Sequence, residues 1–228
     1  MTVVRLPLLP SEGMVSRAAA SGAVTRPGPP GAEWLDFHCT DCGNCCTQTL
    51  VPITADDLWQ VCRGTGLAPG RVASFQPTSR FDDGGEGLPV VQLDEGRRVM
   101  CLARQPAGAY DDLCGFHQEG RCSVYEHRPV TCRLFPFVVS LDPETGEIDE
   151  LTMSGRVECV YERTGDVQLE QLKEQASIEM SRDARFSELV ALWNRRHPGG
   201  TRKAFFKFLR EYAPEPVRDG ALLEGGGR

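Results

Sequence analysis

The sequence predicts an α+β fold, in which short hairpins and helices are followed by a C-terminal helical segment. Two pairs of short apolar runs flank turn-forming residues, which is typical of hairpins. From about residue 167 to residue 212, apolar residues recur every three to four positions, which indicates amphipathic helices. Four of the ten cysteines fall between residues 39 and 46, so one short loop must place several sulfurs close together.

Composition divides the chain into four parts. Residues 1–33 contain a Pro- and Gly-rich run and little that could pack, which predicts a disordered leader. Residues 34–160 contain all ten cysteines and are expected to form the main domain. Residues 161–213 are expected to be helical, and residues 214–228 to be a flexible tail.

The first helix is expected over residues 54–64. Thr54 is a good N-cap, Asp57 suits the positive end of the helix dipole, and a glycine at position 64 or 66 ends the helix. Cys62 lies among the apolar positions of this helix. It is therefore expected to be a core thiol, because free cysteine is among the most buried residue types.

Two hairpins are expected on either side of the second group of cysteines. The first joins residues 88–93 to residues 97–102 across a three-residue turn that ends in Gly96. The second joins residues 135–141 to residues 147–153 across a turn that contains proline and glycine. Sheets this small need additional stabilisation from the rest of the fold.

The C-terminal apolar pattern predicts three helices. They cover Val167–Ser181, Arg185–Arg196 and Arg202–Tyr212, and Pro198-Gly199-Gly200 separates the last two. Apolar stripes of this kind are far more often core surfaces than cofactor pockets.

Charge and hydropathy exclude two classes of partner. The formal net charge is −7 and the isoelectric point is about 5.2, so no basic excess is available to neutralise the phosphates of a nucleic acid. No stretch approaches the roughly 18 apolar residues that a membrane helix needs. We therefore expect a cytoplasmic protein that binds neither nucleic acid nor membrane.

The most specific stretch is Cys39-Thr40-Asp41-Cys42-Gly43-Asn44-Cys45-Cys46. Cysteines three residues apart let the backbone curl around one centre, which is how a chain binds zinc or another soft or borderline metal. Gly43 and Asn44 suit the tight turn that this requires, because both tolerate positive φ. The adjacent side chains of Cys45 and Cys46 diverge, so they can reach two metals, or one metal and a supporting position.

An even number of cysteines is also compatible with disulfides. Three features oppose that interpretation. The first residues lack the sustained apolar run of a signal peptide, and a chain of 228 residues that is 40% hydrophobic can bury a core without covalent links. Ten cysteines in 228 residues are also well below the roughly 8–10% typical of disulfide scaffolds. Metal binding is favoured, and a metal between the hairpins would stabilise them.

A second cysteine-rich stretch runs from residue 114 to residue 137. Cys114, Cys122 and Cys132 are spaced too widely to form one metal-binding knuckle. They can complete a site begun at residues 39–46 only if the chain folds back on itself. We therefore expect the two stretches to share one metal-rich centre.

Two arginines flank the short helix that is expected to begin near Pro129 and to carry Cys132. Four thiolates around a divalent metal, or around an iron-sulfur core of charge +2, leave a net charge of −2. Guanidinium groups of Arg128 and Arg133 would compensate that charge, and we expect them to support the cofactor. The alternative is that both are ordinary surface arginines.

The two stretches combine into one pattern, Cys39-x2-Cys42-x2-Cys45-Cys46 followed by Gly120-x-Cys122-x2-Tyr125-x2-Arg128-Pro129-x2-Cys132-Arg133-x-Phe135-Pro136. Over roughly residues 37–160, this pattern resembles the CxxCxxCC cysteine-cluster family, whose members are described as zinc- or iron-chelating. The cysteine motif is also similar to that of flagellin lysine N-methylases, which implies an iron-sulfur centre and methyl transfer. The chain departs from a methylase because it shows no glycine-rich strand-turn-helix for a nucleotide-like methyl donor.

Eight cysteines are the expected metal ligands. They are Cys39, Cys42, Cys45, Cys46, Cys114, Cys122, Cys132 and Cys159. Cys159 matches the late cysteine that family members tend to carry. The eight could form two four-sulfur sites, or one cluster with spare thiols. Cys101 is the first substitute, Cys62 is a weaker one, and His38 is a minor alternative ligand.

Two classes of function stay open. The first is a metal-binding protein that coordinates zinc or iron, or an iron-sulfur cluster, in a structural, carrier or sensor centre. The second is an iron-sulfur-dependent enzyme of the lysine N-methylase type. No acid-base or nucleophile set is recognisable, and zinc and iron-sulfur are not separable from the sequence.

Overall fold

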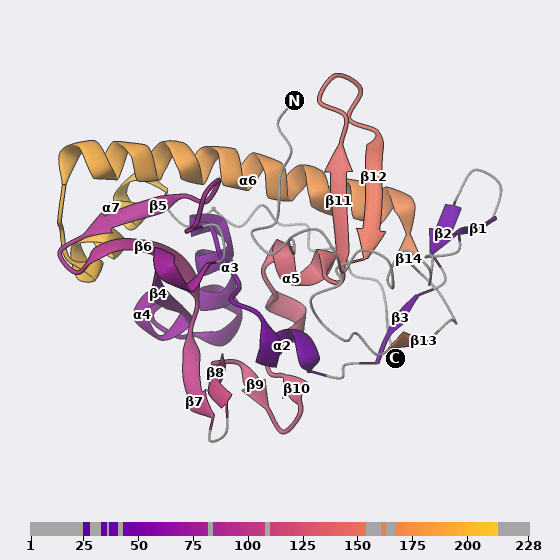
Figure 1. The fold of residues 1–228 in the computed structure, drawn as a ribbon, viewed down its shortest axis with the longest axis horizontal. Helices are drawn as coiled ribbons and strands as arrows, with labels where there is room; N and C mark the ends of the chain where they lie inside the picture. Colours follow the sequence, from indigo (N-terminus) through magenta and orange to yellow (C-terminus); the bar gives the residue numbers. More distant parts are fainter. Residues whose placement is uncertain are drawn as a thin grey trace.

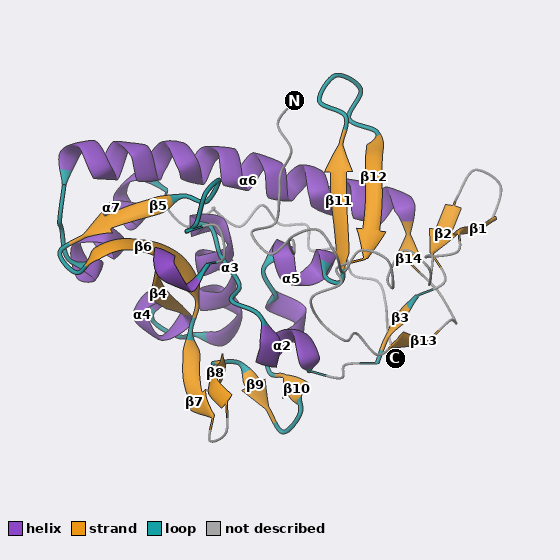
Figure 2. Cartoon of the chain, in the orientation of Figure 1, coloured by secondary structure: helices purple, strands orange, loops and turns teal. Residues whose placement is uncertain are grey.

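A computed structural model describes residues 25–27, 33–35, 37–40, 43–81, 84–107, 110–153, 161–162 and 167–213. Cys42 and Cys159 lie outside the described residues, as do most of the expected leader and the expected tail. The fold is α+β, as predicted: short antiparallel strand pairs and small helices lie along one long C-terminal helix, α6 (Figure 1, Figure 2).

The first predicted helix is confirmed as α3 (Ala55–Thr65). Thr54 caps it, and a reciprocal capping box forms because the Thr54 backbone N–H donates to Asp57 Oδ2 while the Asp57 N–H donates to Thr54 Oγ1. The helix ends at Gly66, whose φ of 70° places it in the left-handed conformation that suits glycine. A four-residue helix, α4 (Pro69–Val72), follows.

The first predicted hairpin is confirmed as β5 (Val90–Leu93) and β6 (Gly96–Leu102). Leu93 pairs with Gly96, so the loop has two residues rather than the expected three, and Gly96 takes a φ of 100°. The sequence did not predict a third strand, β4 (Ala73–Pro77), which pairs with β6 and gives the order β4-β6-β5. A 3-10 turn, η2 (Thr78–Arg80), follows β4.

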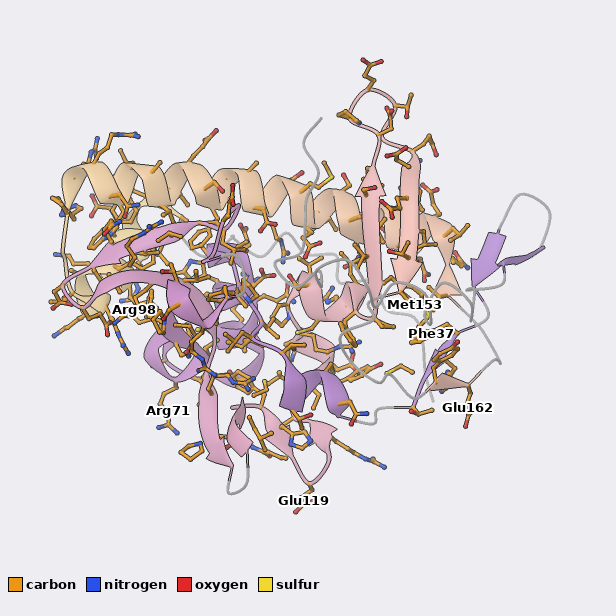
Figure 3. All side chains as sticks on the ribbon, viewed as in Figure 1. Phe37, Arg71, Arg98, Glu119, Met153 and Glu162 are labelled. Atoms are coloured by element: carbon orange, nitrogen blue, oxygen red, sulfur yellow. The ribbon has the colours of Figure 1, made fainter. Side chains whose placement is uncertain are left out.

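The region between the hairpins consists of short elements. They are β7 (Arg104–Ala107) paired with β8 (Tyr110–Cys114), β9 (His117–Gln118) paired with β10 (Arg121–Cys122), η3 (Tyr125–His127) and α5 (Val130–Leu134). Figure 3 shows Glu119 at the tip of the β9–β10 hairpin, pointing away from the molecule. Elements this short depend on their neighbours for stability.

The second predicted hairpin is confirmed as β11 (Phe137–Leu141) and β12 (Ile148–Met153). It packs on the N-terminal half of α6 through a separate apolar cluster that includes Phe37, Leu134 and Leu172. The rings of Phe37 and Phe137 meet edge to face at 4.9 Å, and Phe37 lies beside Met153 in Figure 3.

The start of α6 is flanked by two small strand assemblies. β1 (Thr25–Pro27), β2 (Glu33–Leu35) and β14 (Val167–Gln168) form one sheet in that order, and β3 (His38–Cys39) pairs with β13 (Tyr161–Glu162).

The prediction of two helices over residues 167–196 is wrong, because one helix, α6 (Leu169–Arg196), covers this span. No proline or glycine lies between Ser181 and Arg185, so nothing in the sequence ends the helix there. Two arginines near the expected boundary contact α3. Arg182 Nη1 donates to Asp57 Oδ1 at 2.6 Å, and Arg185 Nη2 donates to Asp56 Oδ2 at 2.9 Å.

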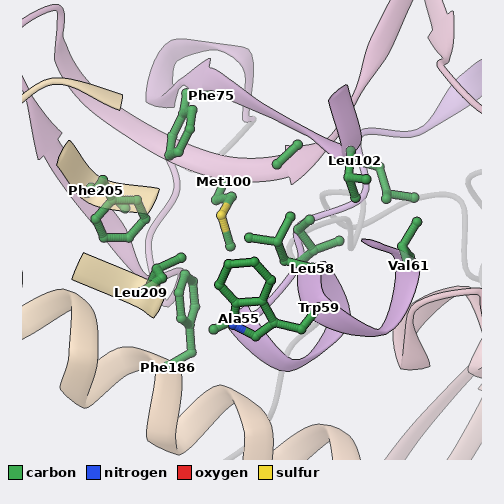
Figure 4. Close-up of a cluster of buried hydrophobic side chains, with 14 of the residues drawn as sticks. Ala55, Leu58, Trp59, Val61, Phe75, Met100, Leu102, Phe186, Phe205 and Leu209 are labelled. Atoms are coloured by element: carbon green, nitrogen blue, oxygen red, sulfur yellow. The ribbon is translucent and has the colours of Figure 1, made fainter. Parts of the chain in front are cut away.

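The last predicted helix is confirmed as α7 (Arg202–Tyr212), capped by Thr201. The main core joins it to α3, to the β4–β6–β5 sheet and to the C-terminal half of α6 (Figure 4). Figure 4 shows Phe186, Phe205 and Leu209 converging with Trp59, Phe75 and Met100. This core therefore takes residues from both sides of residue 160.

The C-terminal half of α6 is also tied to the edge of the sheet by hydrogen bonds. The Trp193 indole N–H donates to the Gln92 carbonyl at 3.0 Å, and the Asn194 amide bonds the backbone of both Gln92 and Val90. These contacts cover backbone groups of the edge strand β5 that would otherwise be unpaired. Among the described helices, none is long and apolar enough to cross a membrane.

Candidate metal centre

The first cysteine motif ends in a five-residue helix, α2 (Asn44–Gln48), which carries Cys45 and Cys46. Gly43 precedes the helix with a φ of 72°, which confirms the tight turn predicted there. Asn44 belongs to the helix rather than to the positive-φ turn. The turn closes through a hydrogen bond from the Cys46 N–H to the Gly43 carbonyl at 2.9 Å.

The turn at Gly43 packs directly on the β9–β10 hairpin of the second cysteine stretch. A Cβ atom at position 43 would lie 2.7 Å from His117 Nε2 and 2.9 Å from the Gly120 carbonyl oxygen. Only glycine avoids both contacts and also accepts the left-handed backbone. This close approach brings the two cysteine stretches together.

Five sulfurs lie together at this junction. They belong to Cys45 and Cys46 of α2, Cys114 at the end of β8, Cys122 in β10 and Cys132 in α5. Cys46 is hydrogen-bonded to both Cys45 and Cys114, while Cys122 and Cys132 each interact electrostatically with Cys45 and Cys114. The structure thus joins four elements that are up to 87 residues apart in the chain.

The hydrogen bonds make two of these thiols more acidic. Hydrogen bonding from Cys46 lowers the pKa of Cys45 to about 7 against the opposing effect of burial, and Arg128 lowers it further. The pKa of Cys114 is also lowered to about 7, mainly by Cys46, with smaller contributions from the Phe116 backbone and Arg104. The thiolate is the form that binds metals, so both sulfurs are suited to that role.

The other three thiols are held in their neutral form in the absence of metal. The pKa of Cys46 is raised because its hydrogen bonds to Cys114 and Cys45 stabilise the thiol. Burial raises the pKa values of Cys122 and Cys132. Metal binding would therefore release protons from these sulfurs.

The described sulfurs share one region without forming a closed ligand sphere. Among the residues that the structure describes, no three His, Cys, Asp or Glu side chains are grouped so as to hold a metal ion. Cys42, next to the Gly43 turn, lies outside the described residues. The donor chemistry nevertheless fits a thiophilic metal, because the sulfurs are soft donors and come from several elements.

The remaining described cysteines are not among the groups that act on these five sulfurs. Cys39 is exposed in β3, opposite Tyr161 of β13, and the neighbouring His38 is exposed as well. Cys62 is half-buried in α3 and packs against the main core. Cys101 is fully buried beside Phe81 and Val99, and burial raises its pKa to about 12.

The two arginines expected near the cofactor occupy different positions. Arg128 lies over the Tyr125 ring at 3.7 Å, and its charge acts on Cys45, Cys122 and Cys132. Arg133 Nε donates to the Arg128 carbonyl at 3.0 Å, and its charged neighbours are Arg182, Arg128, Asp57 and Glu126. Arg133 thus contacts the backbone of Arg128.

Asp57 fixes the helix that carries Cys132, a role that the sequence did not suggest. Its Oδ1 atom accepts the Val130 N–H at 3.2 Å and Arg182 Nη1 at 2.6 Å. The Thr131 hydroxyl donates to Glu179 Oε1 at 2.7 Å. Asp57 therefore links α3 to α6 and to α5, the helix that carries Cys132.

A second functional residue that sequence reasoning missed is Arg104. Its Nη1 atom donates to the carbonyl oxygens of Thr49 at 2.8 Å and Cys46 at 3.4 Å, at the C-terminal end of α2. The only sequence signal is its position between Cys101 and Cys114. That position indicates nothing until the pairing of β7 with β8 places Arg104 opposite Cys114.

Comparison with known proteins gives one match. The model of the CxxCxxCC family, described as "Putative zinc- or iron-chelating domain", matches residues 38–160, which are more than half of the chain. No curated protein and no solved structure matches the chain.

Proposed function

The chain belongs to the CxxCxxCC family, and on this premise we propose that it binds zinc or iron through the cysteines that converge at the junction of its two motifs. These are Cys45, Cys46, Cys114, Cys122 and Cys132. The observation that carries the proposal is that four separate elements direct interacting sulfurs to one place. Isolated core thiols, such as Cys101, show no such mutual interactions.

The ligand set is completed from the other cysteines of the two motifs. Cys42 is the first candidate, because it is adjacent to the Gly43 turn that packs on the β9–β10 hairpin. Cys39 and Cys159 are the remaining candidates, and β3, which contains Cys39, pairs with β13, which begins two residues after Cys159. One polynuclear centre or two neighbouring sites would use this set.

The arginines balance the charge of the centre. The charge of Arg128 interacts with Cys45, Cys122 and Cys132. Its guanidinium would therefore compensate the excess negative charge of a metal-thiolate site. Arg133 supports this role by binding the Arg128 carbonyl.

All eight described cysteines are free thiols, which supports a reducing compartment such as the cytoplasm.

A bound metal here would link four elements, each of five residues or fewer. Zinc would supply a structural link between them, and an iron-sulfur cluster would also supply an electron-transfer centre. The chain's own contribution is to hold α2, β8, β10 and α5 in register around the sulfurs.

Metal analysis of protein purified without oxygen, together with its visible spectrum, tests the proposal and identifies the metal. We expect at least one equivalent of zinc or iron in the wild-type protein, with broad visible absorption only if the iron is in a cluster. Cys45→Ser, Cys114→Ser and Cys132→Ser should each lower the metal content at least severalfold.

Cys62→Ser is the matched control, because Cys62 is a half-buried thiol of α3 and is not among the groups that act on the five junction sulfurs. It should retain the wild-type metal content. Loss of metal in Cys62→Ser equal to that in Cys114→Ser would contradict the proposed site. Wild-type protein that binds neither zinc nor iron after reconstitution would contradict the proposed function.

A further inference from the structure

We infer that Arg104 is a positioning residue of the proposed metal centre: it locks the helix that carries Cys45 and Cys46 against the strand that carries Cys114, and it compensates negative charge there. This inference rests on the proposed function, and it assigns a role to a residue outside both cysteine motifs.

The first step is the hydrogen bonding at the end of α2. A helix of five residues leaves nearly all of its carbonyl groups without partners inside the helix. The Thr49 hydroxyl donates to the Cys45 carbonyl at 2.6 Å, and Arg104 Nη1 donates to the carbonyls of Cys46 and Thr49. Arg104 thus anchors α2 through the carbonyl of Cys46 itself, at the end where a positive charge is favourable.

The second step is that the backbone just before Arg104 is held in place by the core. The preceding residues belong to the core: the Leu102 N–H donates to the Val51 carbonyl at 2.9 Å, and the Ala103 N–H donates to the Val72 carbonyl at 2.8 Å. Leu102 is 3% exposed. Arg104 therefore begins β7 at the point where the chain leaves the main sheet, with its backbone fixed on one side.

The third step is the link to Cys114. Arg104 pairs with Cys114 across β7 and β8, and the Gly115 N–H donates to the Ala103 carbonyl at 2.6 Å. A Cβ atom at position 115 would lie 2.9 Å from that carbonyl oxygen, so glycine permits the close approach. One short segment, 103–104, thus fixes both Cys114 and the helix of Cys45 and Cys46.

The charge of Arg104 acts at the same place. Its guanidinium binds the carbonyl of Cys46 and its strand partner is Cys114, so its positive charge lies next to two of the proposed ligands. A second positive charge comes from Arg128, which lies in the chain between Cys122 and Cys132.

Titration of metal-free, reduced protein with Co²⁺ in the absence of oxygen tests the inference, because thiolate ligation of Co²⁺ gives a visible charge-transfer band. Arg104→Met keeps most of the side-chain length but removes the charge and the donors. It should weaken Co²⁺ binding by roughly 10–100-fold, the range found for groups that support metal ligands. Arg104→Lys keeps the charge and one donor, and it should recover at least a third of that loss on a logarithmic scale.

Arg71→Met is the control, because Arg71 is exposed on α4 and points away from the molecule in Figure 3. It should bind Co²⁺ as the wild type does. Circular dichroism of the metal-free proteins checks folding, and if Arg104→Met fails to fold, Arg104→Lys and Arg104→Gln carry the comparison.

Two results would overturn the inference in distinguishable ways. Equal Co²⁺ affinity in the wild type and in the folded Arg104 variants would remove the role of Arg104 and leave the proposed metal centre standing. A wild-type protein without a thiolate-to-cobalt band would overturn the proposed centre, and the role of Arg104 with it. If Arg104→Lys and Arg104→Met lost the same amount of Co²⁺ affinity, Arg104 would not compensate charge and would act only through its hydrogen bonds.

Discussion

Glu179 is a buried carboxylic acid that makes stability depend on pH. It is 4% exposed and accepts the Thr131 hydroxyl, and burial raises its pKa to about 7, with Asp183 and Asp57 adding to the effect. Because the pKa is higher in the folded than in the unfolded protein, the folded protein binds more protons between about pH 4.5 and pH 7. The contribution of Glu179 to stability is therefore most favourable below pH 4.5 and becomes unfavourable as the pH rises through 7.

We predict that Glu179→Gln stabilises the protein at pH 8 and changes its stability little at pH 5. Glutamine keeps an oxygen that accepts the Thr131 hydroxyl and removes the buried charge. Since one pKa unit corresponds to about 1.4 kcal/mol, the gain in unfolding free energy at pH 8 should be about 1–3 kcal/mol. Urea unfolding at both pH values measures it, with Glu188→Gln on the exposed side of α6 as the control. A gain as large at pH 5 as at pH 8 would refute this assignment.

Single residues show where sequence reasoning ends. Gly43 was predictable, because the cysteine spacing demands a tight turn and glycine supplies it. Arg104 and Asp57 were not, because their partners lie 55 to 125 residues away and are set by strand pairing and helix packing. The position of Arg128 near the sulfurs was expected from the sequence, because it lies only four residues before Cys132.

Among the elements, those with strong local signals were predictable. The caps of α3 and the turns of the two hairpins are each determined by residues that are close together in the sequence. The helix and both hairpins form as predicted. The strand β4, the pairs β1–β2 and β7–β8, and the two-residue strands β3, β9, β10, β13 and β14 were not predicted, because strands this short carry little local signal and depend on pairing. The single helix α6 was predicted as two helices, although no proline or glycine lies between residues 181 and 185.

The packing of α3, α5 and α6 depends on Asp57. Its carboxylate is 1% exposed and bonds Thr54, Val130 and Arg182, so Asp57→Ala removes the side-chain half of the capping box of α3 and leaves buried donors without partners. We predict a loss of about 3–5 kcal/mol in the free energy of unfolding, the usual result of breaking a buried ion pair.

Asp56→Ala is the matched control for this prediction, one residue away on the same helix. Its partner Arg185 has a side chain that is 63% exposed, so the pair is screened by water and the loss should be about 0–1 kcal/mol. Urea unfolding at pH 7 compares the two variants. Similar losses in both would show that Asp57 does not link the three helices.

At the scale of the whole molecule, the main apolar core and the short elements that carry the cysteines should differ in how much they depend on a bound metal. The main core holds the large side chains of α3, the three-stranded sheet, α6 and α7, and Trp193 lies within 5.4 Å of the rings of both Phe205 and Phe208. The cysteine elements α2, β8, β10 and α5 have two to five residues each. A metal centre would supply the stability that these elements lack.

We predict that chelation loosens the cysteine elements before it unfolds the main core. Structural zinc contributes about 10–16 kcal/mol in small metal domains, whereas a whole domain is stable by only about 5–15 kcal/mol, so the midpoint of thermal unfolding should fall markedly. Hydrogen exchange with and without a chelator, under reducing conditions, should show faster exchange over residues 43–49 and 110–134. Residues 58–61, 99–102, 186–193 and 205–209 should keep their protection, because the packing of their large apolar side chains does not require a metal. Unchanged exchange over residues 110–134 would show that the metal binds a preformed site, and loss of protection everywhere would show that the core itself depends on it.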